Sequence, residues 1–203
     1  MIRRLVILFL APLSLCAVAA LAQESPDALV KRVSEDVLAS IRADKDLQAG
    51  NQAKVKELIE SKLVPHFDFT RMTALAMGRN WRSATPEQQK QLTDQFRTLL
   101  VRTYSGALSN YRDNTIDYKP LKMNPGDNEV TVRTEVRRPS QSPVPIDYSM
   151  EKTADGWKAY DIIVAGVSLV TTYRDEFGDI IKTSGIDGLV KALGDKNRGP
   201  APK

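Results

Sequence analysis

Few side chains in this sequence have the type and spacing needed for catalysis. His66 is the only histidine, and it lies between Pro65 and Phe67 without a surrounding motif. A metal site or a serine–histidine pair built on it has no support from spacing. The sequence also contains no glycine-rich loop of the kind that cradles phosphate groups. We therefore predict no catalytic residues, no bound metal and no cofactor.

Asp161 is the carboxylate of most chemical interest, because it lies within the largely apolar segment 157–164. Facing an apolar cavity, it would be a buried acid with a raised pKa. Facing outward, or paired with an arginine, it would be structural. The second interpretation is the one we favour.

The first 22 residues have the three-part organisation of a secretory signal peptide. Arg3 and Arg4 form a basic start, residues 5–20 are apolar, and Ala20-Leu21-Ala22 is a small-x-small cleavage site. The apolar run is shorter than the roughly 20 residues that span a membrane. We predict cleavage after Ala22 and export; an uncleaved membrane anchor is the alternative.

Cleavage would remove Cys16, the only cysteine, so the mature chain would have no disulfide and no thiolate chemistry. Lipidation of Cys16 is not expected, since Leu15 precedes it where a small residue is needed. Loss of Arg3 and Arg4 lowers the formal net charge from +4 to +2. The charges are interspersed, which argues against nucleic acid as a partner. Residues 23–203 are long enough for a single domain with its own core, ending in a loose tail at 196–203.

Hydrophobic residues recur at helical spacing along much of the chain. The strongest case begins at Thr85-Pro86-Glu87-Gln88, which combines a threonine cap, proline at the first helical position and glutamine in the capping-box position. Segment 68–78 is apolar almost all round, so we expect it to be buried or to line an apolar space. The predicted helices are 26–41, 51–63, 68–78, 86–111, 168–181 and 184–193.

A period of two replaces the helical period after Asn114. Val130, Val132, Thr134 and Val136 alternate with polar residues, which is typical of a half-buried strand. The predicted strands are 115–123, 129–137, 144–152 and 157–164. Short connections predict a twisted antiparallel meander of four strands, with helices packed on its dry face, and hence an α+β fold.

The strand at 157–164 leads directly into the amphipathic helix that follows Ser168. Together they can wall two sides of one apolar space, which is either a ligand cavity or a filled core. Periodicity alone favours the filled core, because packed interiors are the rule. Strand alternation places Tyr160, Ile162 and Val164 on one face and Asp161 with Ile163 on the other; an error of one residue would exchange the two sets.

Several short motifs, in one order, resemble the MlaC family of periplasmic phospholipid-binding proteins of Gram-negative bacteria, also called toluene-tolerance auxiliary proteins. The resemblance covers residues 27–193. The residues that carry it are Phe67-Asp68-Phe69-Thr70, Gly78-Arg79-Asn80-Trp81-Arg82, Thr85-Pro86-Glu87-Gln88, Phe96, Leu99-Leu100-Val101-Arg102-Thr103-Tyr104, Gly156-Trp157-Lys158-Ala159-Tyr160-Asp161, Gly166-Val167-Ser168-Leu169-Val170, Tyr173-Arg174 and Phe177.

The resemblance implies a cystatin-like or NTF2-like fold whose cavity holds the acyl chains of a glycerophospholipid. It implies a periplasmic carrier that exchanges lipid with an outer-membrane lipoprotein–porin complex and with the inner-membrane MCE-domain subunit of an ABC transporter. Such a carrier would maintain the lipid asymmetry of the outer membrane and would have no enzymatic activity. No motif in the sequence identifies a site for the lipid head group.

We expect the cavity to be lined by apolar and aromatic side chains from both layers. The predicted lipid-binding residues are Met72, Leu75, Leu99, Tyr104, Leu108, Val132, Tyr148, Tyr160, Ile162, Val164, Val167, Leu169 and Tyr173. Two alternatives remain open. One is a small-molecule enzyme on the same fold that uses Asp161, and the other is a periplasmic adaptor with a filled core and no ligand.

Overall fold

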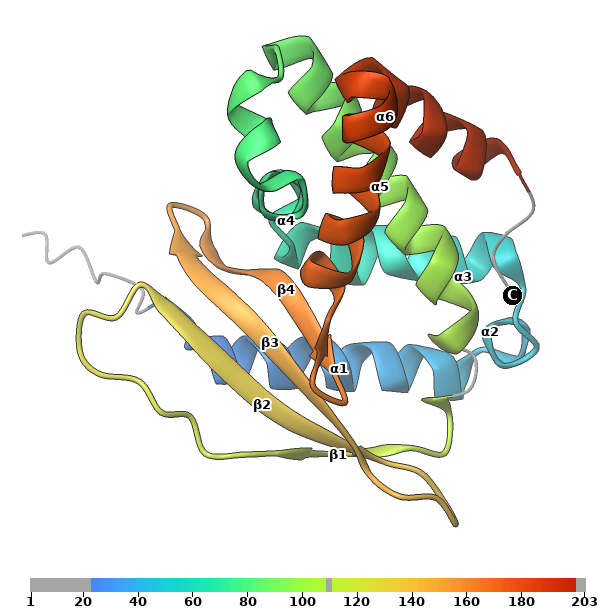
Figure 1. The fold of residues 1–203 in the computed structure, drawn as a ribbon. Helices are drawn as coiled ribbons and strands as arrows, with labels where there is room; N and C mark the ends of the chain where they lie inside the picture. The colour runs from blue at the N-terminus through green and yellow to red at the C-terminus, as the bar shows by residue number, and fades with distance from the viewer. Residues whose placement is uncertain (1–22, 109–110, 200–203) are drawn as a thin grey trace, which may run out of the picture.

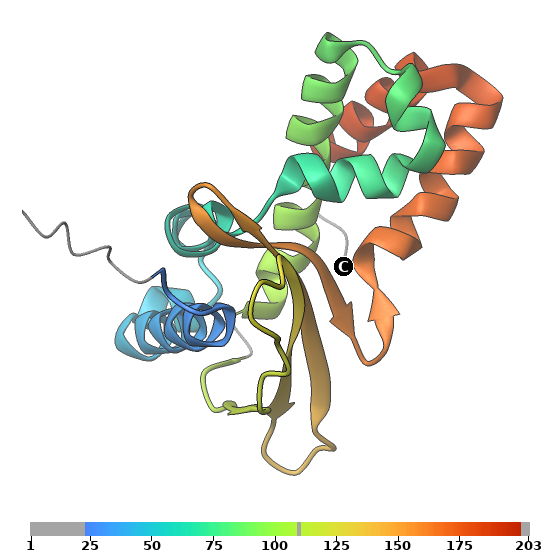
Figure 2. The same cartoon turned by 90° about the vertical axis from the view of Figure 1, so that its left-hand side faces the viewer.

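The protein is built from one antiparallel sheet and a set of helices, an α+β architecture (Figure 1). The computed structural model describes residues 23–108 and 111–199. The predicted signal peptide, residues 1–22, and its cleavage site lie outside the described residues. Helix α1 crosses one face of the sheet, and α4, α5 and α6 group together above one end of it (Figures 1 and 2).

Most helices follow the predicted segments, but the short helix at Lys45–Gln48 was not predicted. Residues predicted as one helix, 51–63, form α3 and then a π-helical turn at Ile59–Leu63, which a 3-10 turn at Val64–His66 extends. A further 3-10 turn covers Gly78–Ser83, which connects the predicted helices 68–78 and 86–111. The helices are α1 (Pro26–Ala43), α2 (Lys45–Gln48), α3 (Gln52–Leu58), α4 (Phe69–Met77), α5 (Pro86–Leu108) and α6 (Leu169–Arg198).

The start of α5 is a reciprocal capping box, as the sequence predicts. The Gln88 backbone N–H donates to the Thr85 hydroxyl at 3.2 Å, and the Thr85 N–H donates to Gln88 Oε1 at 2.9 Å. Helix α4 is capped by the Asp68 carboxylate, which accepts from the Arg71 N–H at 2.7 Å. It ends at Gly78, whose φ of 57° suits glycine and stops the helix. Local sequence signals therefore set both helix boundaries.

Helix α6 is longer than the sequence predicts. The two helices expected at 168–181 and 184–193 are one element bent at Gly185, where φ is 71° and ψ is −176°. The helix continues to Arg198, so residues 196–198, predicted as part of a loose tail, are helical. The Asn197 side-chain amide donates to the Gln95 carbonyl at 2.9 Å, which ties this end of α6 to α5.

The sheet has five strands rather than the four predicted. Their order is β1-β2-β3-β4-β5, and every neighbouring pair is antiparallel. The additional strand is a two-residue segment after the Ala165-Gly166 turn, too short to show alternation. The strands are β1 (Thr115–Tyr118), β2 (Glu129–Arg137), β3 (Val144–Thr153), β4 (Gly156–Val164) and β5 (Val167–Ser168). Strand β1 ends two residues before Pro120, which cannot donate to a ladder. The cystatin-like or NTF2-like likeness stays a prediction.

A β-bulge interrupts the pairing of β3 with β4. Ser149 pairs with Asp161 and Met150 pairs with Ala159, which leaves Tyr160 as the extra residue. A bulge exchanges the faces of the residues on either side of it. Ala159 therefore shares a face with Ile162 and Val164, and Tyr160 does not.

Three groups of buried side chains hold the layers together. The first lies among α4, α5 and α6 around Phe96 and Phe177, whose ring centroids are 5.0 Å apart. The second joins α1 to β2, β3 and β4 around Met150. The third joins α1 to α2 and α3 around Ile41 and Val55.

Candidate functional site: an apolar pocket between the helices and the sheet

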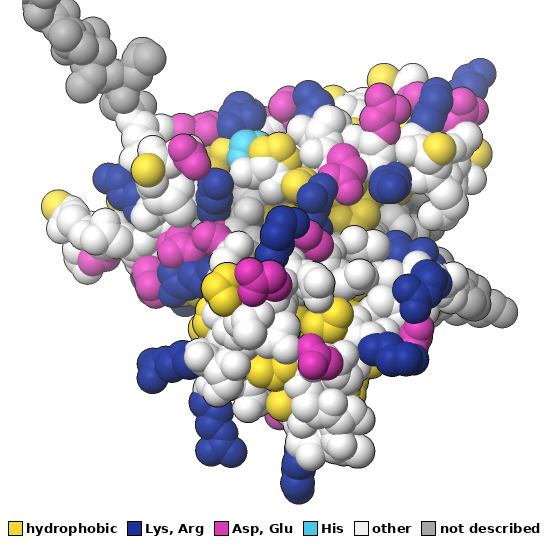
Figure 3. All heavy atoms as spheres, turned by 90° about the horizontal axis from the view of Figure 1, so that it is seen from above, with side chains coloured by type: hydrophobic (Ala, Val, Ile, Leu, Met, Phe, Trp, Pro, Cys, Tyr) yellow, Lys and Arg dark blue, Asp and Glu magenta, His cyan; other side chains and the backbone are white. Residues whose placement is uncertain are grey.

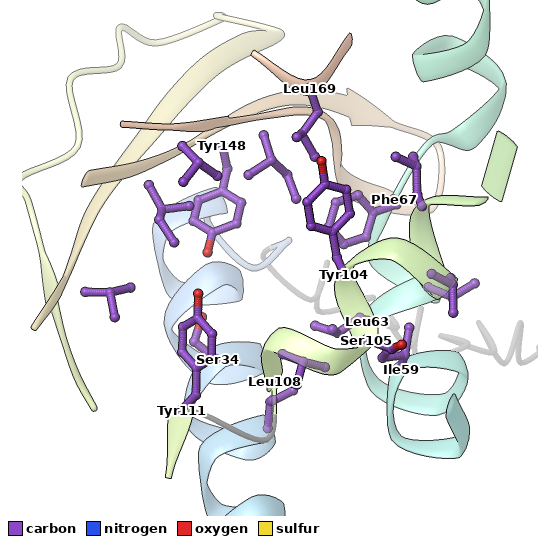
Figure 4. Close-up of a pocket in the computed structure, with 18 of the residues that line it drawn as sticks. Ser34, Ile59, Leu63, Phe67, Tyr104, Ser105, Leu108, Tyr111, Tyr148 and Leu169 are labelled. Carbon is purple, nitrogen blue, oxygen red and sulfur yellow. The ribbon is translucent and has the colours of Figure 1, made fainter. Parts of the chain in front are cut away.

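A pocket of about 260 Å³ lies between the sheet and the helices (Figure 4). Its walls come from α1, the helical segment 59–64, the start and middle of α4, the second half of α5, strands β1 to β4 and the first residue of α6. The lining residues are Ser34, Val37, Leu38, Ile59, Leu63, Val64, Phe67, Phe69, Met72, Leu100, Val101, Tyr104, Ser105, Leu108, Tyr111, Ile116, Val136, Ile146, Tyr148, Ile162, Val164 and Leu169. All are apolar or aromatic except two serines, so the pocket suits an apolar ligand.

Helix α5 supplies one wall through its last two turns. Tyr104 and Leu108 are four residues apart, so their side chains lie on one face and point into the pocket (Figure 4). Tyr104 is the most exposed of the lining side chains, at 42 %. The sheet supplies the opposite wall, where Tyr148 on β3 stands directly across from Ile162 on β4.

The structure brings about half of the predicted lining residues together around the pocket. Those that line it are Met72, Tyr104, Leu108, Tyr148, Ile162, Val164 and Leu169. Those that do not are Leu75, Leu99, Val132, Tyr160, Val167 and Tyr173.

Leu75, Leu99 and Tyr173 belong to the filled core among α4, α5 and α6 instead. The Tyr173 ring packs edge-on against Phe96, with centroids 4.9 Å apart. The apolar stripe of α5 is wide because it serves two purposes: its first half packs in this core and its second half faces the pocket. Hydrophobic periodicity does not distinguish a filled core from a pocket wall. For this reason the sequence predicted Leu99 as a lining residue, whereas it lies in the core.

Val132 and Val167 lie elsewhere for different reasons. Val132 is buried against α1 in the second core group, since the pocket begins only toward the Val136 end of β2. Val167 is 60 % exposed; it lies in the two-residue edge strand β5, where it pairs with Val164.

The expected position of Tyr160 in the pocket lining is corrected, because the β-bulge places its side chain elsewhere. Its ring stacks on the Arg71 guanidinium, with 3.7 Å from the Arg71 Cζ to the ring centroid, and its hydroxyl donates to Glu129 Oε2 at 3.2 Å. Arg71 also pairs with Glu129 at 2.7 Å and with Glu151 at 2.5 Å. This group fastens α4 to the ends of β2 and β3, outside the pocket.

The pocket-lining residues that come from α1 and from the segment 59–69 were mostly not predicted from the sequence. Val136 and Ile146 could have been predicted as lining residues, because they share strand faces with Val132 and Tyr148, which were predicted. Ser34, Ser105 and Tyr111 had none, since polar or amphipathic side chains were not sought in an apolar wall.

Asp161, the carboxylate of most chemical interest, has a structural role. The Asp161 carboxylate accepts hydrogen bonds from the Ser168 hydroxyl at 2.5 Å and from the Val170 N–H at 3.1 Å, at the first turn of α6. Burial and the nearby Arg32 guanidinium lower the pKa of His66, which favours the neutral imidazole. Within residues 23–108 and 111–199 no cluster of His, Cys, Asp and Glu has the composition of a metal site.

The pocket does contain hydroxyl groups. Burial raises the pKa of the Tyr148 phenol to about 12; the neighbouring Tyr111 adds to the rise and the Thr134 hydroxyl opposes it. Tyr148 is therefore un-ionised at physiological pH and acts as a hydrogen-bonding group in an apolar wall.

The outer surface carries both signs of charge. Lys and Arg side chains alternate with Asp and Glu over the face in Figure 3, with scattered hydrophobic groups between them. No helix in the described part of the chain combines the length and the hydrophobicity that a bilayer crossing requires.

A sheet and helices that surround an apolar pocket define a binding protein for an apolar ligand. The family model described as MlaC protein matches residues 31–195, and the chain belongs to that family. This chain is 27% identical over 187 residues to the toluene tolerance protein ttg2D of Pseudomonas putida, and the match covers 92% of this chain and 85% of that protein. It is 23% identical over 184 residues to the intermembrane phospholipid transport system binding protein MlaC of Haemophilus influenzae, covering 86% of this chain and 83% of that protein.

A solved structure agrees with the fold. It is the phospholipid-binding protein from Ralstonia solanacearum in complex with a phospholipid, which is 47% identical in sequence with a TM-score of 0.81. The match covers 86% of this chain and 97% of the other. The MlaC family membership expected from the sequence motifs is confirmed.

Proposed function

We propose that this protein binds a glycerophospholipid by enclosing its acyl chains in the pocket between the sheet and the helices. The observation that carries the proposal is the pocket itself, whose lining is apolar apart from a few hydroxyl groups. The Ralstonia solanacearum relative, solved with a phospholipid at 47% identity, supports the same ligand class. The lining residues Met72, Leu108, Ile162, Val164 and Leu169, together with Tyr104 and Tyr148, are the proposed lipid contacts.

Energetics favour a carrier over an irreversible binder. Burying a methylene contributes about 0.8 kcal/mol, so two chains with roughly 30 carbons represent about 24 kcal/mol of gross hydrophobic gain. Net non-covalent affinities stop near about 18–21 kcal/mol, so ordering costs offset part of that gain. A carrier only has to match the bilayer, which an apolar pocket with few head-group contacts achieves.

The proposed role is transport through the periplasm. The exported chain would exchange lipid with an outer-membrane lipoprotein–porin complex and with the inner-membrane MCE-domain subunit of an ABC transporter, and so maintain outer-membrane lipid asymmetry. The name of the Haemophilus influenzae relative, a phospholipid transport system binding protein, supports transport. Asp161 is engaged by two hydrogen bonds at the start of α6, which speaks against its use as a catalytic acid.

Native mass spectrometry of the mature protein, purified without detergent, tests this function. We expect a mass increment of one phospholipid, and organic extraction of the same sample should release that lipid. Protein that carries no lipid, and takes none up from phospholipid vesicles, would contradict the proposal.

A further inference from the structure

Three hydroxyl groups from distant parts of the chain line the pocket close to one another. Ser34 comes from α1, Tyr111 follows α5, and Tyr148 lies in the middle of β3. In Figure 4 the hydroxyls of Tyr111 and Tyr148 point toward one another and into the pocket, with Ser34 close by. Apart from Ser105, the remaining lining side chains are apolar or aromatic.

Tyr118, the last residue of β1, does not line the pocket, but its hydroxyl lies near this group. Its hydroxyl is buried and has no hydrogen-bond partner within the described ranges. Burial and the nearby Glu35 raise its pKa, while the Ser34 hydroxyl beside it, which is not in hydrogen-bonding geometry, lowers it. Both Tyr111 and Tyr118 also raise the pKa of Tyr148, which places the three phenols near one another.

A buried hydroxyl without a partner is costly, and proteins usually satisfy such groups with a water that makes two to four hydrogen bonds. An acyl chain can make none. An acyl chain that packs against this end of the pocket therefore has to displace water and leave the hydroxyls unpaired. When the lipid is released, water returns and restores their hydrogen bonds.

We propose that Ser34, Tyr111 and Tyr148 form a water-binding site inside the lipid pocket, which stabilises the lipid-free protein and weakens its hold on acyl chains. This inference rests on the proposed phospholipid binding and adds a group of residues that sets its strength. The site hydrates the empty pocket at one end, so the carrier does not have to collapse or unfold when the ligand leaves.

The first test is a high-resolution crystal structure of the lipid-free protein. We expect an ordered water within hydrogen-bond distance of at least two of the three hydroxyls. A structure in which these hydroxyls bond directly to one another, or in which no water lies among them, would overturn the proposal.

The second test is lipid exchange with Tyr148→Phe, which removes one hydroxyl and keeps the ring. The probe is phosphatidylglycerol with a pyrene-labelled acyl chain, loaded from vesicles. Removing a hydroxyl that must otherwise be desolvated should slow loss of the probe about three- to tenfold. Tyr160→Phe is the matched control, because Tyr160 lies outside the pocket, and it should exchange at the wild-type rate.

The outcomes separate this inference from the proposed function. Wild-type protein that binds no probe would refute phospholipid binding, while the crystallographic test would still decide the water site. Wild-type protein that binds the probe, with Tyr148→Phe releasing it at the same rate or faster, would refute the water site alone. If Tyr148→Phe does not fold, Tyr111→Phe removes a second hydroxyl of the same group and decides in its place.

Discussion

A carboxylate placed in the pocket by Val164→Glu should abolish lipid binding at neutral pH and leave the fold intact. Val164 is the last residue of β4 and faces the pocket, where it pairs across the sheet with Ile146. The new side chain would point into the space proposed for acyl chains. An ionised carboxylate is excluded from that environment, so the lipid can bind only when the glutamate has taken up a proton.

The size of the effect follows from the cost of that proton. With an ordinary glutamate pKa of about 4.3, protonation at pH 7 costs about 3.7 kcal/mol, which weakens lipid binding about 500-fold. At pH 5 the cost falls to about 1 kcal/mol, a factor of about five. Lipid binding by Val164→Glu should therefore recover as the pH is lowered from 7 to 5.

The assay combines lipid extraction with thermal unfolding on the same sample at both pH values. Val164→Gln is the matched neutral control, because it has the same size and polarity without the charge; its lipid load should not depend on pH. Leu99→Glu is the control for a filled core, since Leu99 is buried among α4, α5 and α6. A carboxylate there has no room and no partner, and should cost several kcal/mol of stability.

Two results would refute the placement of the lipid. One is a folded Val164→Glu protein that carries a full lipid load at pH 7. The other is a loss of lipid in Val164→Glu that equals the loss in Val164→Gln and does not recover at pH 5, because the effect would then not come from a charge in an apolar space.

Three further predictions test the pocket hydroxyl, the cap of α6 and the export of the chain. The raised pKa of Tyr148, about 12 against an ordinary value of 10.0, contributes stability that is complete below pH 10 and is lost as the pH rises toward 12. That loss approaches about 3 kcal/mol, so urea unfolding at pH 9 and 11.5 should show a larger fall for the wild type than for Tyr148→Phe; equal falls would contradict the shift. Asp161→Ala should cost about 1 kcal/mol by removing the acceptor for the Val170 N–H, with an unchanged lipid load, and a lost lipid load would instead give Asp161 a role in the site. N-terminal sequencing of protein from the periplasmic fraction should begin at Gln23, and an intact chain in the inner membrane would contradict cleavage after Ala22.

Most of the secondary structure could be predicted from the sequence, because its signals are local. The capping box at Thr85, the alternation in β2 and the turn before β4 each depend on a few adjacent residues. The family could be predicted for a related reason: its motifs lie in one order along the chain.

The positions that could not be predicted depend on contacts distant in sequence. The bulge that removes Tyr160 from the pocket face appears only when β4 is paired with β3. The division of the α5 stripe between a filled core at Leu99 and a pocket at Leu108 depends on where α4 and α6 end their contact with it. The cluster of hydroxyls formed by Ser34, Tyr111 and Tyr148 brings together three segments that are far apart in the sequence, so periodicity could not reveal it.

The central claim is that acyl chains lie between α5 and the β3–β4 face of the sheet. The direct measurement is photo-crosslinking with a phosphatidylglycerol that carries a diazirine in one acyl chain, followed by peptide mapping of the modified sites. We predict adducts on the α5 segment 100–108 and on the strand residues around Tyr148 and Ile162, with competition by unlabelled phospholipid. Adducts confined to the outer surface, or spread over the chain without competition, would contradict it.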